Sequence, residues 1–269
     1  MDALPRDLPQ NPDILAISDS RETELLTLPI DEGRTKNLIG GSNIVQLIYF
    51  GGDGNGVFKP GRGEDTLWEF PESHRLLYKR ERAAYLVSKA LHPGLVPPTI
   101  IRTINGAEGS IQDFIPDPKR TLRETGDGEK EAVRGQLFEI AIFDYVVWNK
   151  DRKPENLFIK DRRVIAIDNG VSFNEWLRGW IPENLSKMVA GRLIPTTLAK
   201  QYDSFLTSDE KQNRLREALE ELVPGKTIDA MFARINQANK FLARGKISWD
   251  DMNDFTYHPG STESIWPKY

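Results

Sequence analysis

The chain has 269 residues, of which 39% are hydrophobic and 28% charged, and its net charge is −4 at pH 7. This composition is typical of a globular protein large enough for one large domain or two lobes. The absence of cysteine excludes disulfides and thiolate chemistry, and the negative charge argues against a nucleic-acid partner.

No apolar run approaches the roughly 20 residues that cross a bilayer, so we expect no membrane insertion. The opening MDALPRDLPQ lacks the pattern of a secretory signal, which predicts a cytoplasmic location. Residues 1–36 combine Pro, Asp and Arg with brief apolar patches, and we expect an arm that lies across the rest of the chain.

Residues 37–115 predict a strand-rich N-lobe. The runs NIVQLIYF (43–50) and GVFKP (56–60) are rich in strand-forming residues and flank the turn GGDGNG, which favours a hairpin. A helix with one apolar face follows in YKRERAAYLVSKAL (78–91). TIIRT (99–103) and GSIQDFIP (109–116) then predict two more strands.

Residues 116–269 predict a helical C-lobe, which begins with the polar stretch 116–130. The run 131–149 is apolar on nearly every side from Leu137 to Trp148, as in a helix enclosed by its own lobe. Two short strands, LFI and VIAID, follow around a charged turn, and amphipathic helices are expected at 208–223, with Ser208 as N-cap, and at 227–244. The fold class is therefore α+β.

Three polar residues lie where apolar segments end. Asp151 and Asn156 follow the buried helix, and Asp168 ends the second short strand, before Asn169 and Gly170. The hairpin between these segments brings the Asp151–Asn156 loop and the Asp168 segment together at one opening, which we call the mouth. The oxygens of Asn156 and Asp168 suit Mg²⁺ together with substrate phosphates. Asp151 then remains to accept a hydroxyl proton, and its spacing to Asn156 matches the Asp-to-Asn step of a kinase catalytic loop.

The strand-rich lobe offers groups for the phosphates of a nucleotide. In IGGSN, the backbone N–H groups of Gly41, Ser42 and Asn43 can face anionic oxygens. Lys59 lies on the partner strand and can neutralise phosphate charge, and Glu81 on the following helix can hold it as an ion pair.

The strand SIQDFIP leads to the lobe boundary. We expect its edge backbone at Gln112, Asp113 and Phe114 to bind adenine. Singly, each of these features has a common structural explanation: glycines form turns, strand lysines are edge charges, and helix glutamates form surface pairs. Their occurrence in this order, across two lobes of suitable character, favours a nucleotide site.

DRKPEN (151–156) followed by IDNG (167–170) resembles the catalytic core of the phosphatidylinositol 3- and 4-kinases. Over residues 38–180 the chain looks closest to a bacterial group of small proteins with that fold. The resemblance implies a bilobed protein-kinase-like fold that uses ATP and Mg²⁺. It also implies Lys59 on the ATP phosphates and Glu81 as its partner. The implied catalytic Asp is Asp151, followed by Arg152, and the implied Mg²⁺ ligands are Asn156 and Asp168.

The sequence departs from the family at two positions. Lys153 stands where the lipid kinases commonly have His, and Asn169 replaces the aromatic residue of the usual Asp-Phe-Gly. Residues 169–187 contain only Arg178 and Lys187 as basic residues, which disfavours an anionic inositol headgroup as substrate. Trp176 and Trp180 are expected either to pack against the helical lobe or to dock a protein segment.

The sequence therefore predicts an ATP- and Mg²⁺-dependent phosphotransferase that acts on a protein hydroxyl or on a small hydroxylated metabolite. Two alternatives remain open: a nucleotide-binding pseudokinase that acts as a regulatory module, and an adenylyl transferase on the same fold.

Overall fold

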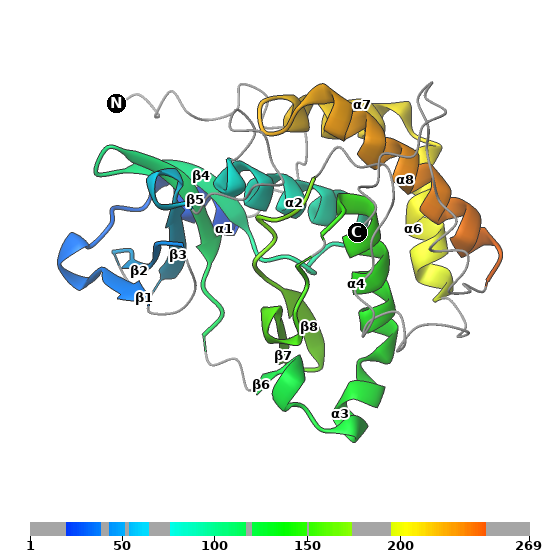
Figure 1. Ribbon diagram of the computed structural model, residues 1–269, viewed down its shortest axis with the longest axis horizontal. Helices are drawn as coiled ribbons and strands as arrows, with labels where there is room; N and C mark the ends of the chain where they lie inside the picture. The colour runs from blue at the N-terminus through cyan, green and yellow to red at the C-terminus, as the bar shows by residue number, and fades with distance from the viewer. Residues whose placement is uncertain are drawn as a thin grey trace, which may run out of the picture.

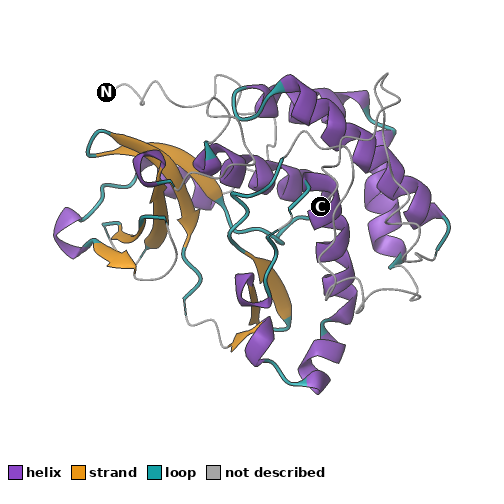
Figure 2. Cartoon of the chain, in the orientation of Figure 1, coloured by secondary structure: helices purple, strands orange, loops and turns teal. Residues whose placement is uncertain are grey.

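The structure is a computed structural model that describes residues 20–38, 43–51, 54–64, 76–116, 120–149, 151–173 and 195–245. Its strand-rich part is an antiparallel five-stranded sheet in the order β1-β2-β3-β5-β4 (Figures 1 and 2). The strands are β1 (Lys36–Leu38), β2 (Val45–Tyr49), β3 (Asn55–Pro60), β4 (Thr99–Ile104) and β5 (Ala107–Asp113). β5 therefore lies inside the sheet, between β3 and β4.

One face of the sheet carries a small apolar core. β3 alternates between half-buried and buried residues, as a strand with a single core face does. Phe58 points into this core, so Val57 and Lys59 share the opposite face, as the sequence predicts. The buried members of the core are Leu25, Ile48, Phe50, Phe58, Ile100 and Ile111.

Helix α1 (Ser20–Thr27) lies within residues 1–36, for which the sequence predicts only an arm. Its Leu25 is fully buried in the core of the sheet. After the helix, Ile30 pairs with Phe50 in an isolated β-bridge. Local pattern alone did not predict this helix, because eight residues are too few for a stable helix without tertiary packing.

Helix α2 (Leu77–Leu91) lies between the sheet and the helical part of the molecule (Figure 1). It contacts β4 and β5 on one side and α4, α6 and α7 on the other. Its buried apolar residues from Ala83 to Leu91 belong to the core of the helical part and not to the core of the sheet. α2 is therefore the element that both parts share.

The helical part contains α3 (Asp127–Ala132), α4 (Arg134–Val147), α6 (Thr196–Leu206), α7 (Asp209–Glu220) and α8 (Gly225–Ala243). Every residue of α4 from Ile140 onward is buried, which confirms the enclosed helix. The predicted single helix is interrupted at Val133 (φ −106°, ψ 8°). Ser208 caps α7 as expected, since its hydroxyl accepts a hydrogen bond from Lys211 N at 3.3 Å.

A second antiparallel sheet, in the order β6-β7-β8, stands beside α4 (Figure 1). It consists of β6 (Arg120–Thr121), β7 (Leu157–Lys160) and β8 (Arg163–Ala166). Short 3₁₀ turns occur at η2 (Glu32–Arg34), η3 (Gly61–Gly63), η5 (Leu122–Glu124) and η6 (Pro154–Asn156). Within the described ranges, no helix combines the length and the apolar character that a membrane span requires.

Candidate active site

Three charged side chains from distant parts of the sequence meet beside the sheet. Lys59 comes from β3, Glu81 from α2, and Asp168 from the segment just after β8. The ammonium Nζ of Lys59 donates a hydrogen bond to Glu81 Oε1 and another, at 2.8 Å, to Asp168 Oδ1. Glu81 is buried, whereas the side chain of Asp168 is 53% exposed. The exposed carboxylate leaves one side of this cluster open to a ligand.

The charges in this cluster stabilise one another. Burial by itself lowers the pKa of Lys59, but the attraction of Glu81 and Asp168 outweighs it, and the net pKa lies above its ordinary value. The same attraction by Lys59 holds the pKa of Asp168 below its ordinary value. At neutral pH Lys59 is therefore a cation and Asp168 an anion.

Glu81 also holds the segment that carries Asp168. Its second oxygen, Oε2, accepts a hydrogen bond from Asn169 N at 2.9 Å. Asp168 itself has a positive φ of 59°, an uncommon conformation for a residue with a side chain. A Cβ on Gly170 would lie 3.3 Å from Leu77 Cβ, so the segment packs closely against the start of α2. One glutamate thus positions both Lys59 and the backbone beside Asp168.

The loop after α4 presents Asp151 to solvent. Asp151 N donates a hydrogen bond to Asn149 Oδ1 at 3.1 Å, which fixes the backbone of the loop. The carboxylate of Asp151 is 42% exposed and accepts a hydrogen bond from Lys153 Nζ at 2.9 Å. This bond raises the pKa of Lys153 above its ordinary value. Lys153 is therefore a cation at neutral pH, next to the predicted proton acceptor.

The same loop brings Asn156 to Asp168. The 3₁₀ turn η6 ends at Asn156, whose Nδ2 lies 3.4 Å from Asp168 Oδ2. Asn156 O also accepts a hydrogen bond from Ile167 N at 3.0 Å. The β7–β8 hairpin connects the two segments, so the two loop ends share one mouth, as the sequence predicts.

Arg152 does not face the mouth. Its side chain is 1% exposed and forms an ion pair with the fully buried Asp144 of α4, with an Nη2 to Oδ1 distance of 2.9 Å. It also donates hydrogen bonds to Ile167 O and to Asn169 Oδ1, both at 2.6 Å. Arg152 therefore joins α4, the loop and the Asp168 segment, and its geometry is that of a support and not of a group that touches substrate.

Two supporting residues were not predicted from the sequence. Asp144 is the one acid in the apolar run 140–147, and an acid in such a helix requires a buried partner. Arg80, also buried, donates hydrogen bonds to the carbonyl oxygens of Ser172 and Phe173, and so ties the end of the segment to α2. Arg80 is one of three basic residues around Glu81, and no sequence pattern distinguishes it as the buried one.

The predicted adenine edge is wrong in its geometry, because β5 is an interior strand. Gln112 pairs with Val57 on one side and with Thr99 on the other. The N–H groups of Asp113 and Phe114 donate to Pro98 O at 2.7 Å and to Asn55 O at 3.3 Å. The Asp113 carboxylate accepts a hydrogen bond from Arg21. The N–H groups of Asp113 and Phe114 are therefore not free to donate to a nucleotide base.

Several predicted residues fall outside the described part of the chain. These are Gly41 and Ser42 of the predicted phosphate loop, and Trp176, Arg178, Trp180 and Lys187. Asn43, the third member of the loop, is half-buried and lies two residues before β2.

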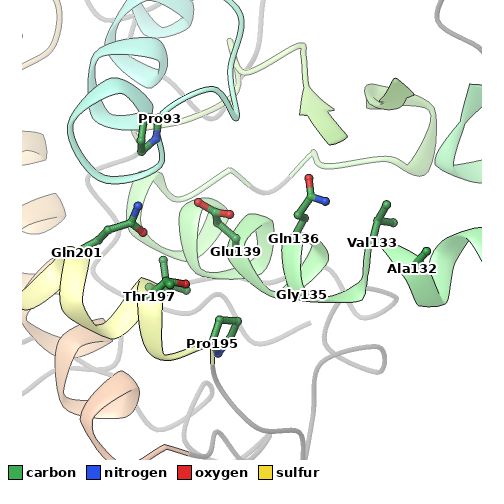
Figure 3. Close-up of a pocket in the computed structure, with 10 residues that line it drawn as sticks. Pro93, Ala132, Val133, Gly135, Gln136, Glu139, Pro195, Thr197 and Gln201 are labelled. Carbon is green, nitrogen blue, oxygen red and sulfur yellow. The ribbon is translucent and has the colours of Figure 1, made fainter. Parts of the chain in front are cut away.

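A cavity of about 370 Å³ opens elsewhere, between Pro93 and the starts of α4 and α6 (Figure 3). Its polar lining residues are Gln136, Glu139, Thr197 and Gln201. Glu139 Oε1 lies 3.2 Å from Nδ1 of the buried His92, whose Nε2 is 2.8 Å from the Tyr202 hydroxyl. The lining includes none of the predicted nucleotide or metal residues, so the chemistry of the Lys59 cluster is separate from this cavity.

The donors at the mouth fit a divalent cation that is shared with a phosphate ligand. Asp168 offers a half-exposed carboxylate, and Asn156 offers an amide beside it. Amide orientation is an assignment, and a half turn of this amide directs its oxygen to the same place. Mg²⁺ takes one or two protein oxygens together with phosphates and water. In the described residues there is no group of three or more His, Cys, Asp or Glu side chains that would enclose a metal.

Comparison with known sequences supports the resemblance. Residues 131–250 match the family model described as phosphatidylinositol 3- and 4-kinase. The match contains both DRKPEN and IDNG, and it confirms the predicted resemblance. It extends beyond residue 180, where the predicted resemblance ended, and it leaves the strand-rich residues 38–115 outside.

A protein relative and two solved structures are also similar. Protein Rv2133c of Mycobacterium tuberculosis (strain ATCC 25618 / H37Rv) is 45% identical over 178 residues. The match covers 50% of this chain and 63% of that protein, so the chain spans less than two-thirds of this relative's length.

A Golgi casein kinase with Mn and ADP bound has a TM-score of 0.57 at 16% identity, over 83% of this chain and 75% of that one. The hydra Fam20 structure with sugar has a TM-score of 0.60 at 14% identity, over 85% of this chain and 90% of that one. At these identities the likeness shows the fold alone. It confirms the predicted kinase-like fold, with an antiparallel sheet and a helical C-terminal part.

Proposed function

We propose that the chain is an ATP- and Mg²⁺-dependent phosphotransferase that transfers the γ-phosphoryl group to a hydroxyl group. The observation that carries this proposal is the cluster in which Lys59 contacts Glu81 and Asp168, with Asn156 3.4 Å from Asp168. The match to the kinase family model and the fold shared with a Mn/ADP-bound kinase support it. We also propose that the boundary between the two lobes lies near residue 116.

The lysine is the group best suited to the nucleotide phosphates. Its ammonium is shared by Glu81 and Asp168. Asp168 and Asn156 would hold Mg²⁺, and Lys59, kept in place by Glu81, would neutralise the charge of the phosphate oxygens. The N–H groups of Gly41, Ser42 and Asn43, which stand between β1 and β2 in the sequence, are proposed as further donors to the phosphates. Bound Mg²⁺ supplies charge neutralisation on the phosphates.

Asp151 is the proposed proton acceptor in the transfer step. The acceptor hydroxyl oxygen forms a bond to the γ-phosphorus, and the bond from that phosphorus to the β–γ bridging oxygen breaks. The electron pair of the broken bond leaves with ADP, and the hydroxyl proton passes to the Asp151 carboxylate. Lys153, 2.9 Å from this carboxylate, is close enough to balance the charge of the phosphoryl group as it moves.

The acceptor is proposed to be a hydroxyl of a protein or of a small metabolite. An inositol lipid is disfavoured because residues 169–187 supply only Arg178 and Lys187 as cations. The absence of a His at position 153 separates the loop further from the lipid kinases that the family model describes.

The experiment is incubation of the protein and a mixture of candidate acceptors with Mg²⁺ and ATP labelled separately at the α or the γ position. The expected result is transfer of the γ label, which is lost in Asp151→Asn and Asp168→Asn. Transfer of the α label would replace the proposal with adenylyl transfer. Nucleotide binding without transfer of either label would replace it with a regulatory pseudokinase.

A further inference from the structure

The first turn of α1 carries a glutamate that contacts two basic residues of α2. Glu22 Oε1 accepts a hydrogen bond from Arg82 Nη1 at 2.8 Å, and Oε2 accepts one from Lys89 Nζ at 3.0 Å. All three side chains are less than 20% exposed. Burial raises the pKa of Glu22, but the two cations outweigh it, and the net pKa is lowered. Glu22 is therefore an ionised, shielded bridge between the helices.

The two contacts, together with a hydrogen bond from Arg82 Nη1 to Thr99 O of β4, fix the rotation of α2 about its own axis. Arg82 and Lys89 are seven positions apart, close to two full turns, so they lie on one side of the helix. Glu81 is the neighbour of Arg82 and points about 100° away, toward Lys59. Rotation of α2 that moves Glu81 away from Lys59 must also move Arg82 and Lys89 away from Glu22.

α1 is fixed to the sheet, which carries Lys59. Leu25 is fully buried in the core of the sheet. Arg102 of β4 donates hydrogen bonds to the carbonyl oxygens of Leu25 at 3.0 Å and of Leu28 at 2.8 Å, at the end of the helix. Arg21 forms an ion pair with Asp113 of β5 at 2.7 Å. α1 therefore moves with the sheet as one body.

α2, in contrast, has its apolar side in the core of the helical part. The Lys59–Glu81 pair therefore joins a lysine of the sheet to a glutamate of α2, the helix that both parts share. Glu22, on α1, connects the sheet to α2 at a second point, about 100° around the helix from that pair.

We infer that Glu22 is a positioning residue for the phosphoryl transfer proposed above, a role that rests on that function: through Arg82 and Lys89 it keeps Glu81 against Lys59. Glu22 is bound to Arg82 and Lys89 and not to Glu81 or Lys59, so its effect on the site is indirect. A glutamate that only stabilised the fold would leave the chemistry of Lys59 unchanged in the folded protein.

The test measures the reactivity of Lys59 in the full chain, without substrate. Acetylation of each lysine by an N-hydroxysuccinimide ester at pH 8 is followed by mass spectrometry. Glu22→Gln is expected to raise the rate at Lys59, because an amine that loses its contact with Glu81 is more accessible to the ester. Glu81→Gln defines the full effect, and Lys89→Gln, which removes one of the two contacts, should give an intermediate rate.

The matched control is Glu24→Gln, the same substitution two positions along the same helix. Glu24 is 46% exposed and pairs within α1 with Arg21. Its variant should leave the rate at Lys59 unchanged, and circular dichroism checks that all variants are folded. A Glu22→Gln rate equal to that of Glu24→Gln overturns the role of Glu22. A Glu81→Gln rate equal to that of the parent overturns it as well, because Glu81 would then not control Lys59.

Turnover of ATP provides the second readout. Glu22→Gln is expected to lower kcat about tenfold, and to cause no further loss in the Glu81→Gln background, since both act through the same pair. Additive losses would contradict the inference. If the parent protein transfers no phosphoryl group, the proposed function fails, while the acetylation rates still decide whether Glu22 positions Glu81.

Discussion

Replacement of Asp144 by Asn is predicted to destabilise the protein strongly, because it leaves the Arg152 guanidinium without its counterion in the interior. Asp144 is fully buried and Arg152 is 1% exposed. Loss of one partner from a buried ion pair typically costs about 3–5 kcal/mol. Arg152 keeps its hydrogen bonds to Ile167 O and Asn169 Oδ1, and the new amide oxygen can still accept one. The expected loss is therefore at the lower end, about 3 kcal/mol.

The chain offers a matched control in the pair Arg216–Asp229. The separation of its charged atoms, 2.7 Å, is close to the 2.9 Å of the buried pair, but the side chains are 39% and 63% exposed. Asp229→Asn is the same chemical change in water, where an ion pair contributes at most about 1 kcal/mol. The difference between the two variants isolates the effect of burial.

Urea unfolding at pH 7, followed by circular dichroism, measures both free energies of unfolding. A loss of about 3 kcal/mol is a large part of the 5–15 kcal/mol typical of a domain, so the Asp144 variant should still fold at low urea. The reasoning is refuted if the two variants differ by less than about 1 kcal/mol, since burial would then add nothing to the pair.

Three further predictions concern the site and the sheet around it. Asp168→Asn should abolish Mg²⁺-dependent ATP binding in calorimetry with little change in thermal unfolding, whereas undiminished binding would remove it from the metal site. Gly109→Ala should destabilise by about 1–3 kcal/mol, because its Cβ would lie 2.4 Å from Lys59 O. Gly128 of α3 is the control, because a Cβ there would meet no atom within 4 Å. Gly128→Ala should be neutral or stabilising in thermal unfolding, and equal effects of the two substitutions on stability would contradict the close packing of Gly109. The stability lost in Glu22→Gln at pH 7 should shrink below about pH 4.5, the ordinary pKa of its carboxyl group. The lowered pKa of the folded state means that the unfolded chain binds the proton first as pH falls, and a pH-independent difference in urea titrations would be evidence against the ion pairs.

Much of the cluster could be predicted, because its residues stand at the ends of recognisable elements. Lys59 follows from the two-residue alternation of a strand, and Asp168 from the end of a short apolar run. The position of β5 inside the sheet could not be predicted. Its neighbours are set by which strands pair, and β3 and β5 are separated in the sequence by α2 and β4.

Helix α6 and Asp144 each carry a recognisable pattern in the sequence. The buried residues Leu198, Tyr202 and Phe205 of α6 follow helical spacing within TTLAKQYDSFL. Asp144 in an apolar helix indicates a buried partner, but the sequence does not say which of the nearby cations supplies it. The contacts of Glu22 depend on how α1 and α2 pack, and no local pattern encodes that arrangement.

The residue at position 169 determines how the Asp168 segment is held. Asn169 is fully buried; its N–H binds Glu81, and its Oδ1 binds Arg152, which Asp144 fixes in turn. Movement of Asn169 away from this position would leave a buried carboxylate and a buried guanidinium each short of a hydrogen bond, at a cost of about 1–3 kcal/mol per group. An aromatic residue at this position would keep the backbone hydrogen bond to Glu81 but would lack the side-chain oxygen that binds Arg152. Polar contacts therefore hold the Asp168 segment against α2, through Glu81, and against α4, through Arg152 and Asp144.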